Sequence, residues 1–353
     1  MKKILMIALL LVTAVTVVGC SQKETLYVLN WGEYMDMDLV AAFEKEFNVR
    51  VIYDEVGSNE EMEILISAGN TPYDIAIPSE YMIHQLHTQG LLKPINTALL
   101  PNLENVTFFE DATDLYADEP YVDYMIPYFF GSIGIIYNTT NPAVKAAIVE
   151  QGFGALFDPN TPFRIGLYDS ARDAVGAALM TLGFDPNTTD DSALQQAETL
   201  LLNANFREIG DDNLKSLVIQ NNLDMALVYS GDYFDELYAH EEEGLTVNFD
   251  FYVPNVSNIW IDAFVLPTTG QNVELAHKFI NYFLDVEIMV ENADWVGYTP
   301  VMVEAYTILV EEYEYDYEHY YPQPEGSIRK AYQFISFEHT QRLNDILTRV
   351  RAN

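Results

Sequence analysis

Residues 25–56 read TLYVLNWGEYMDMDLVAAFEKEFNVRVIYDEV, and their pattern decides the fold class. Residues with β-propensity alternate with residues of helical periodicity in this stretch and just beyond it. We expect, in chain order, a strand at 25–29, a helix at 38–47, a strand at 49–53, a helix at 60–68 and a strand at 74–77. In the first helix Leu39, Phe43 and Phe47 recur at every fourth residue, which predicts one face packed on a sheet. This order predicts an α/β protein with a mostly parallel sheet.

A cluster of aromatic and acidic residues follows the first predicted strand directly. It reads Asn30-Trp31-Gly32-Glu33-Tyr34. In open α/β sheets ligands bind at the carboxyl ends of strands. Aromatic rings next to a carboxylate suit an organic cation. The cluster therefore predicts part of a binding site, with the alternative that the two rings merely fill the corner between strand and helix.

Similar loops follow later predicted strands. Ser79 and Tyr81 come after the strand at 74–77, and Tyr229 ends a buried run at 225–228. The loop after residues 164–167 contains Asp169, Ser170 and Asp173. Asp169 or Ser170 has the alternative role of capping the following helix, and Asp173 that of complementing its dipole.

Asp262 lies inside an apolar strand predicted at 258–267, two residues after Trp260 and so on the same face. A buried carboxylate is costly unless something pairs with it. We expect Asp262 to bind a ligand, with the alternative that backbone donors satisfy it in the core.

Charge and composition limit the partners. The chain has 353 residues, 49% of them hydrophobic, which is enough for the cores of two domains. Its 17 Lys and Arg against 54 Asp and Glu give a net charge of −37, which repels nucleic acid and anionic lipid. Solubility alone accounts for most of this charge, so it favours a cationic ligand only weakly.

The first twenty residues have the pattern of a targeting signal. Lys2 and Lys3 precede an apolar run from Ile4 to Val18 that is short for a spanning helix, and Cys20 follows Gly19. The segment resembles a lipoprotein signal: we expect 1–19 to be removed and Cys20, the only cysteine, to be lipidated. The alternative is an uncleaved membrane anchor. Both place the rest of the chain outside the cytoplasm, at the outer face of the membrane or in the periplasm, and a lipidated Cys20 leaves no internal disulfide.

Six segments, taken together, resemble the spermidine/putrescine-binding proteins of ABC importers over about residues 26–351. They are 30–34, 73–81, 127–131, 169–173, 260–262 and 297–300. The resemblance implies a two-lobed, hinged, type II periplasmic-binding-protein-like fold, with a first lobe at 25–130 plus 260–302 and a second at 131–259 plus 303–353. It also implies a polyamine ligand, spermidine or putrescine, an ABC permease as partner, a monomer, no cofactor, no metal and no catalysis.

The resemblance assigns roles to individual residues. The aromatic walls would be Trp31, Tyr34, Tyr81, Tyr229, Trp260 and Tyr298. The carboxylates would be Asp173 and Asp262, with Glu33 as a third, and the hydrogen-bonding groups Ser79 and Gln333. The chain departs from the family pattern at Gly32, Ser170 and Tyr229, which implies lower affinity or an altered choice between spermidine and putrescine, without loss of function. The neighbouring Asp169 would take over from the acid missing at Ser170 if the loop is shifted by one residue, and otherwise the acid is simply absent.

Two other functions stay open. The first is a different solute on the same fold, such as ferric ion, because Tyr320 and Tyr321 form an adjacent pair within an acidic stretch. The second is a surface hydrolase. The sequence has no Gly-x-Ser-x-Gly, His-Glu-x-x-His or phosphate-binding Gly-rich loop, but paired acids for glycoside hydrolysis are not excluded by counting.

Overall fold

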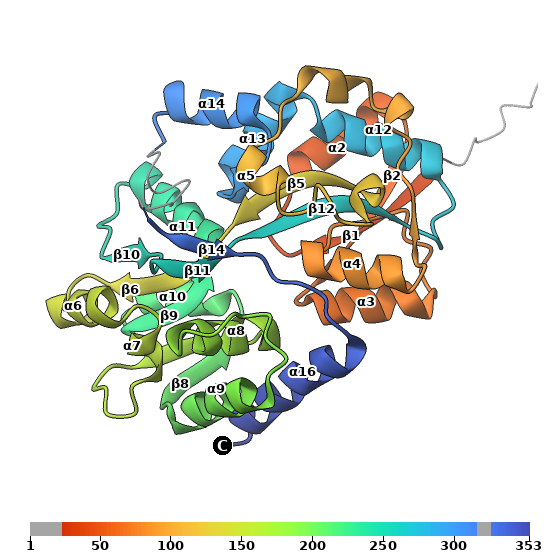
Figure 1. Cartoon of the computed structure of the whole chain (residues 1–353). Coiled ribbons are helices and arrows are strands. Elements are labelled where there is room, and N and C mark those ends of the chain that lie inside the picture. Colours follow the sequence, from red (N-terminus) through yellow and green to blue (C-terminus); the bar gives the residue numbers. More distant parts are fainter. Residues whose placement is uncertain (1–22, 316–325) are drawn as a thin grey trace, which may run out of the picture.

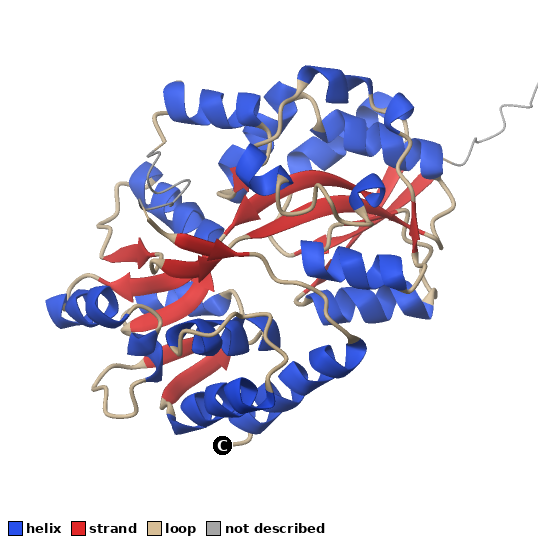
Figure 2. Ribbon diagram, viewed as in Figure 1, coloured by secondary structure: helices blue, strands red, loops and turns tan. Residues whose placement is uncertain are grey.

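The structure is a computed structural model that describes residues 23–315 and 326–353. Its strands form two large sheets and one small sheet, and helices flank the large ones (Figure 2). The larger sheet has the order β13-β5-β12-β3-β1-β2 with β4 beside β12, and the smaller sheet has the order β10-β6-β9-β7-β8. We call each large sheet with its helices the larger unit and the smaller unit.

The strands of the larger unit are β1 (Thr25–Trp31), β2 (Arg50–Val56), β3 (Ile75–Ala76), β4 (Leu92–Lys93), β5 (Met125–Gly131), β12 (Trp260–Pro267) and β13 (Thr299–Pro300). Those of the smaller unit are β6 (Ile133–Asn138), β7 (Ile165–Tyr168), β8 (Phe206–Gly210), β9 (Met225–Tyr229) and β10 (Phe249–Tyr252). The small sheet pairs β11 (Val256–Asn258) with β14 (Ile328–Lys330).

The helices of the larger unit are α2 (Met37–Phe47), α3 (Asn59–Ala68), α4 (Glu80–Thr88), α5 (Glu110–Thr113), α12 (Val273–Phe283), α13 (Val286–Val296) and α14 (Val303–Glu311), with short 3-10 helices at Thr97–Leu99, Pro101–Asn105 and Val122–Tyr124. Those of the smaller unit are α6 (Pro142–Gln151), α7 (Gly154–Phe157), α8 (Ala171–Thr181), α9 (Asp191–Asn203), α10 (Asn213–Ile219), α11 (Ser230–Glu242) and α16 (Phe337–Arg351). In residues 23–315 and 326–353, none of the helices has the length and apolarity to cross a bilayer.

The predicted α/β class is confirmed, and the opening βαβαβ order is present. β1 runs parallel to β2 and to β3, as its fully buried Leu26, Val28 and Leu29 predict for a central strand. Both large sheets are nevertheless mixed rather than mostly parallel. β12 pairs antiparallel with β3 and β5, and β6 pairs antiparallel with β9 and β10. The antiparallel strands β5, β6 and β12 are those that lead from one unit to the other, which short local patterns do not predict.

The chain crosses between the units at two adjacent places (Figure 1). β5 ends at Gly131 and β6 begins at Ile133, while β11 ends at Asn258 and β12 begins at Trp260. The two crossings are joined, because the Ile133 N–H donates to Asn258 Oδ1 at 2.7 Å and Ser257 Oγ donates to the Ile133 carbonyl at 2.9 Å. A third crossing follows β14, and the chain then reaches α16, which packs on α8 and α9.

α14 corrects one expected lobe boundary. The second lobe was expected to resume at residue 303, but α14 packs on α13 and β13 of the larger unit. Tyr306 of α14 lies edge-to-face on Phe109, with ring centroids 5.0 Å apart. Residues 303–311 therefore belong with the larger sheet, because the apolar face of α14 is buried there.

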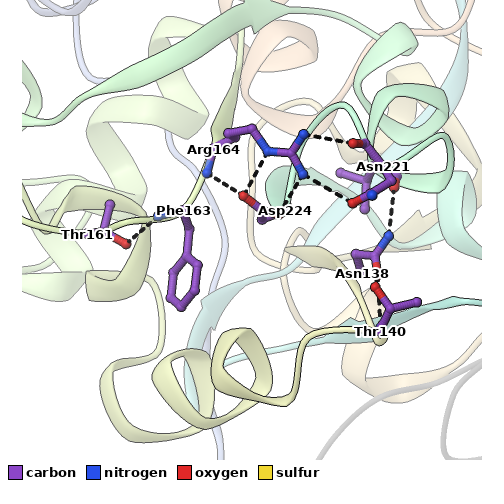
Figure 3. A network of polar contacts seen from close by, with 8 residues as sticks. Asn138, Thr140, Thr161, Phe163, Arg164, Asn221 and Asp224 are labelled. Carbon is purple, nitrogen blue, oxygen red and sulfur yellow. Dashed lines mark hydrogen bonds and ion pairs between the residues drawn. The ribbon is translucent and has the colours of Figure 1, made fainter.

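An ion pair lies at one end of three neighbouring inner strands of the smaller unit, β6, β9 and β7 (Figure 3). The Arg164 guanidinium donates to both Asp224 oxygens, Nε to Oδ2 at 3.0 Å and Nη2 to Oδ1 at 2.8 Å, and Nη1 donates to the Asn221 carbonyl at 2.7 Å. The Arg164 N–H also donates to Asp224. Since the Asp224 carbonyl accepts from the Asn138 N–H, the pair links the ends of β6, β7 and β9. The hydrogen bonds from Arg164 hold the pKa of Asp224 below its ordinary value, although burial opposes this.

Candidate binding site

A cavity of about 110 Å³ lies where the two units meet. Eleven of the thirteen predicted site residues line it, and Asp169 and Gln333 do not. From the larger unit these are Trp31, Glu33, Tyr34, Ser79, Tyr81, Trp260, Asp262 and Tyr298, and from the smaller unit Ser170, Asp173 and Tyr229. The carboxyl ends of β1 and β9 and the first turn of α8 deliver several of them, as the loop pattern predicts.

Aromatic rings form a continuous wall from one unit to the other. Tyr34 meets Tyr298 at 5.2 Å between ring centroids, Tyr298 meets Trp260 at 5.4 Å, and Trp260 meets Tyr229 at 5.9 Å, all near edge-to-face. Gly231, at the start of α11, lets the Tyr298 ring lie against its backbone, where any Cβ would collide with the ring. Trp31 is fixed by its indole N–H, which donates to the Ile77 carbonyl at 2.8 Å. The wall offers π-faces and apolar edges to a ligand.

Asp173 is a buried acid in the first turn of α8, only 4% exposed. The Tyr229 hydroxyl donates to its Oδ2 at 2.7 Å, and its own N–H donates to Ser170 Oγ at 3.3 Å. Ser170 thus caps the helix, the alternative considered for it, and also lines the cavity. Burial raises the pKa of Asp173, and the hydroxyl hydrogen bonds offset part of that rise.

Asp262 is 5% exposed and lies at a bulge in β12, opposite Ser79. Its Oδ1 is buried without a well-formed hydrogen bond, and the Tyr34 and Ser79 hydroxyls are the protein groups that lie beside the carboxylate. The nearby backbone donor, the Ile261 N–H, is taken by Glu80 instead. Burial raises the pKa of Asp262 to about 7, and hydrogen bonding with the Ser79 and Tyr34 hydroxyls opposes part of that rise. The alternative role, a core aspartate satisfied by backbone donors, therefore does not describe the unpaired Oδ1.

The other end of the cavity holds residues that sequence reasoning missed. Lys215 of α10 lies among Glu33, Asp232 and Asp235, and Asp212 lines the cavity beside them. Asp232 and Asp235 follow Tyr229 at positions three apart on α11, so helical spacing after an identified site residue was the available signal. The sequence around Lys215 gave no indication that this residue lines the cavity, because α10 is not adjacent in sequence to any quoted motif. Glu33 is 73% exposed in its side chain and has a left-handed φ of 50°.

Further lining residues missed from the sequence are Glu60, Tyr168 and Tyr332. Tyr332 directly precedes the predicted Gln333. The resemblance therefore pointed to the right segment, but the residue that lines the cavity is the one before the residue it named. Gln333 is exposed, and its carbonyl accepts from Arg172 Nη2 at 3.2 Å. The guanidinium of Arg172 also lies over the Tyr332 ring, 4.6 Å from its centroid, which fixes the wall on this side.

Asp169 points away from the cavity. Its Oδ1 accepts from Arg351 Nε of α16 at 2.6 Å, so it contributes to docking of the last helix. It does not replace the acid absent at Ser170, because that ion pair occupies it outside the cavity.

No cluster of three or more His, Cys, Asp and Glu suited to a metal ion occurs in the two described ranges. The tyrosine pair Tyr320-Tyr321, on which the ferric alternative depends, lies outside the described residues, as do Cys20 and the expected signal peptide 1–19. The cavity presents carboxylates, hydroxyls and rings, a set of groups whose chemistry suits a cationic solute.

Comparison with known proteins gives consistent matches. The model of a family described as bacterial extracellular solute-binding protein matches residues 38–318. The putrescine-binding periplasmic protein of Pseudomonas aeruginosa is 30% identical, over 84% of this chain and 86% of that protein. The spermidine/putrescine-binding periplasmic protein of Escherichia coli is 29% identical, over 82% and 81%. A solved structure from Listeria monocytogenes, described as a candidate spermidine/putrescine ABC transporter, is 34% identical and superposes with a TM-score of 0.82, covering 93% of this chain and 99% of that one.

Proposed function

The chain belongs to the family of bacterial extracellular solute-binding proteins, and we propose that it captures a polyamine outside the cytoplasm for an ABC importer. The names of its relatives as putrescine- and spermidine-binding proteins support this choice of ligand. The proposed role is binding and delivery to membrane permease subunits, without catalysis. The two lobes would correspond to the larger and smaller units.

One observation carries the proposal: Asp173 and Asp262 are buried in an aromatic cavity, and no Lys or Arg in the described ranges forms an ion pair with either. A buried charge needs a partner. The two ammonium groups of a polyamine supply it. At about 4 Å and an effective dielectric near 20, each ion pair has a Coulomb energy of roughly 4 kcal/mol before desolvation is subtracted.

The rings complete the recognition. Trp31, Tyr34, Tyr81, Tyr229, Trp260 and Tyr298 would pack against the methylene chain and hold the ammonium groups over their faces. Each such contact contributes roughly 0.5–2 kcal/mol, so several rings are needed. Ser79 and Ser170 would donate or accept hydrogen bonds at the two acids, and Glu33 would contribute at the rim.

Closure around the ligand would be a hinge motion of the two units about the adjacent crossings near Ser132 and Ile259. The positions of the two acids support this hinge motion, because Asp262 belongs to the larger unit and Asp173 to the smaller unit. A ligand that pairs with both acids stabilises the closed arrangement by its contacts to both sides.

We further propose that Cys20 is lipidated after removal of 1–19 and anchors a monomer to the outer face of the membrane. Mass spectrometry of the protein isolated from membranes tests this: a diacylated or triacylated Cys20 at the new amino terminus is expected. A chain that retains Met1 to Gly19 contradicts it.

Titration calorimetry of the soluble form, residues 21–353, tests the function. Putrescine, spermidine and spermine are injected at neutral pH, and at least one is expected to bind with micromolar or tighter affinity. Asp262→Asn is the site variant. Asp250→Asn is the matched control, since Asp250 is on β10, pairs with Tyr137 and Lys145, and does not line the cavity. Heat from none of the three ligands would refute the function.

A further inference from the structure

The cavity already contains one ammonium group of its own. Lys215 is 7% exposed, and its Nζ lies 3.1 Å from Asp235 Oδ2, 3.5 Å from Glu33 Oε2 and 3.7 Å from Asp232 Oδ1. Among the described residues it is the only Lys or Arg that lines the cavity. Burial works against its charge, but the carboxylates outweigh burial and raise its pKa, so it stays protonated.

Three strongly buried aspartates line the cavity, and they differ in one respect. Asp173, Asp232 and Asp262 are 4%, 6% and 5% exposed. Of these three aspartates, only Asp232 has an ammonium group of the described residues within ion-pair distance. Its Oδ2 also accepts a hydrogen bond from the Tyr229 N–H at 3.2 Å. Lys215 therefore offsets part of the cost of a charge on Asp232, although burial still raises the pKa of Asp232 to about 7, whereas no ammonium group of the described residues lies beside the other two.

The remaining acids at the Lys215 end are less buried than Asp232, although partial burial raises the pKa of Asp212. The side chains of Glu33 and Asp235 are 73% and 42% exposed, and Asp212 is exposed and accepts a hydrogen bond from the Tyr168 hydroxyl at 2.7 Å. Exposed carboxylates attract an ammonium group weakly because water and salt screen them. They do not replace a buried subsite.

We propose that Lys215 determines specificity: its ammonium occupies the subsite at Asp232 that a third ligand ammonium would take, so the cavity selects a diamine over a triamine. This inference rests on the proposed polyamine binding. The two remaining subsites are Asp173 and Asp262. Apolar surface connects them, because Tyr229 contacts Asp173 through its hydroxyl and meets Trp260, two residues from Asp262 on the same strand. Discrimination comes from repulsion between Lys215 and a third ammonium group as well as from lost pairing.

The test compares putrescine and spermidine by titration calorimetry at pH 8 with wild type and three variants. Wild type is expected to bind putrescine more tightly than spermidine. Lys215→Met frees Asp232 and should raise the ratio of spermidine to putrescine affinity by about tenfold or more. Lys215→Arg keeps the charge and should keep the wild-type ratio. Lys145→Met is the matched control, since Lys145 pairs with Asp250 on the surface of the same unit, away from the cavity.

The possible outcomes separate the proposed role of Lys215 from the proposed polyamine binding. An unchanged ratio in folded Lys215→Met, equal weakening of both ligands, or a wild type that prefers spermidine would overturn the inference while leaving polyamine binding intact. Absence of binding by wild type would instead refute the proposed function. Should Lys215→Met fail to fold, Lys215→Gln with Asp235→Asn keeps a neutral hydrogen-bonded pair and still frees Asp232, and the same rise in the ratio is expected.

Discussion

Asp224 directly precedes β9 and Asp262 lies within β12, and the two aspartates differ in which groups of the protein pair with their charge. Asp224 has a bidentate arginine partner and a lowered pKa (Figure 3). Asp262 has an unpaired buried oxygen and a pKa raised to about 7. The first arrangement stabilises the fold, and the second destabilises the ligand-free protein. A buried acid that no cation of the protein pairs with thus marks a candidate position for an external cation.

The largest expected effect comes from Asp262→Asn. Loss of one partner of a buried charge pair should weaken putrescine or spermidine binding by about 2–4 kcal/mol, roughly 30- to 1,000-fold. Calorimetry measures this. An affinity within about threefold of wild type would remove Asp262 from the site.

The same substitution should stabilise the ligand-free protein. The folded pKa of Asp262 is raised, so its cost to stability grows as the pH rises from the ordinary aspartate pKa to about 7 and is complete above about 7, and it is absent below the ordinary aspartate pKa. Asn should therefore increase the free energy of unfolding by up to about 4 kcal/mol at pH 8 and by less at pH 5. Urea unfolding at the two pH values measures the difference; an equal change at both would contradict the assigned cause.

Arg164→Met should destabilise the ligand-free protein, whereas Asp262→Asn should stabilise it. Loss of the charged hydrogen bonds at the ends of β6, β7 and β9 should lower the free energy of unfolding by about 1–3 kcal/mol. The exposure of Arg164 favours the lower part of this range. Because the folded pKa of Asp224 is lowered, the wild-type contribution is full above the ordinary aspartate pKa and disappears as the pH falls through the folded value. Polyamine affinity should stay at the wild-type level, and a tenfold loss would show that the two regions are not independent.

Polyamine affinity itself should depend on pH. Below about pH 7 Asp262 takes up a proton that an incoming ammonium group must displace, and the raised pKa of Asp173 acts in the same direction. Affinity should fall by about tenfold or more between pH 8 and pH 5.5, and by less in Asp262→Asn. Calorimetry in buffers of different ionisation enthalpy should also detect proton release near pH 7. Constant affinity over this range, without proton release, would contradict the raised pKa.

Tyr229→Phe should have the smallest effect. It removes the hydroxyl that donates to Asp173 but keeps the ring beside Trp260. We expect a loss of about 1 kcal/mol in binding, roughly fivefold, and little change in unfolding by urea. A loss as large as that of Asp262→Asn would mean that the hydroxyl contacts the ligand directly.

The sequence predicted the parts of the fold and site that rest on local patterns. Strand and helix periodicity identified β1, α2 and β2, and loops after strands identified Trp31, Tyr34, Ser79 and Tyr81. The quoted motifs contain eleven residues that line the cavity. What failed depends on long-range packing: the antiparallel return of β12, the docking of α14 on the larger unit, and the Arg351 contact that directs Asp169 away.

Lys215 shows most clearly why the rest was not predictable. Its position in the cavity depends on how α10 and α11 pack together and on Glu33 reaching across from the other unit. No spacing in the sequence records these contacts. An acidic chain offers many possible partners for a lysine, and only the folded arrangement selects Asp232, Asp235 and Glu33.

The most direct measurement of the central claim is a crystal structure of residues 21–353 with putrescine bound. We expect one ligand nitrogen within about 3 Å of the Asp262 carboxylate and the other at Asp173, with the methylene chain along the wall formed by Trp260 and Tyr229. A ligand bound elsewhere, or one that leaves Asp262 Oδ1 without a cation, would contradict it.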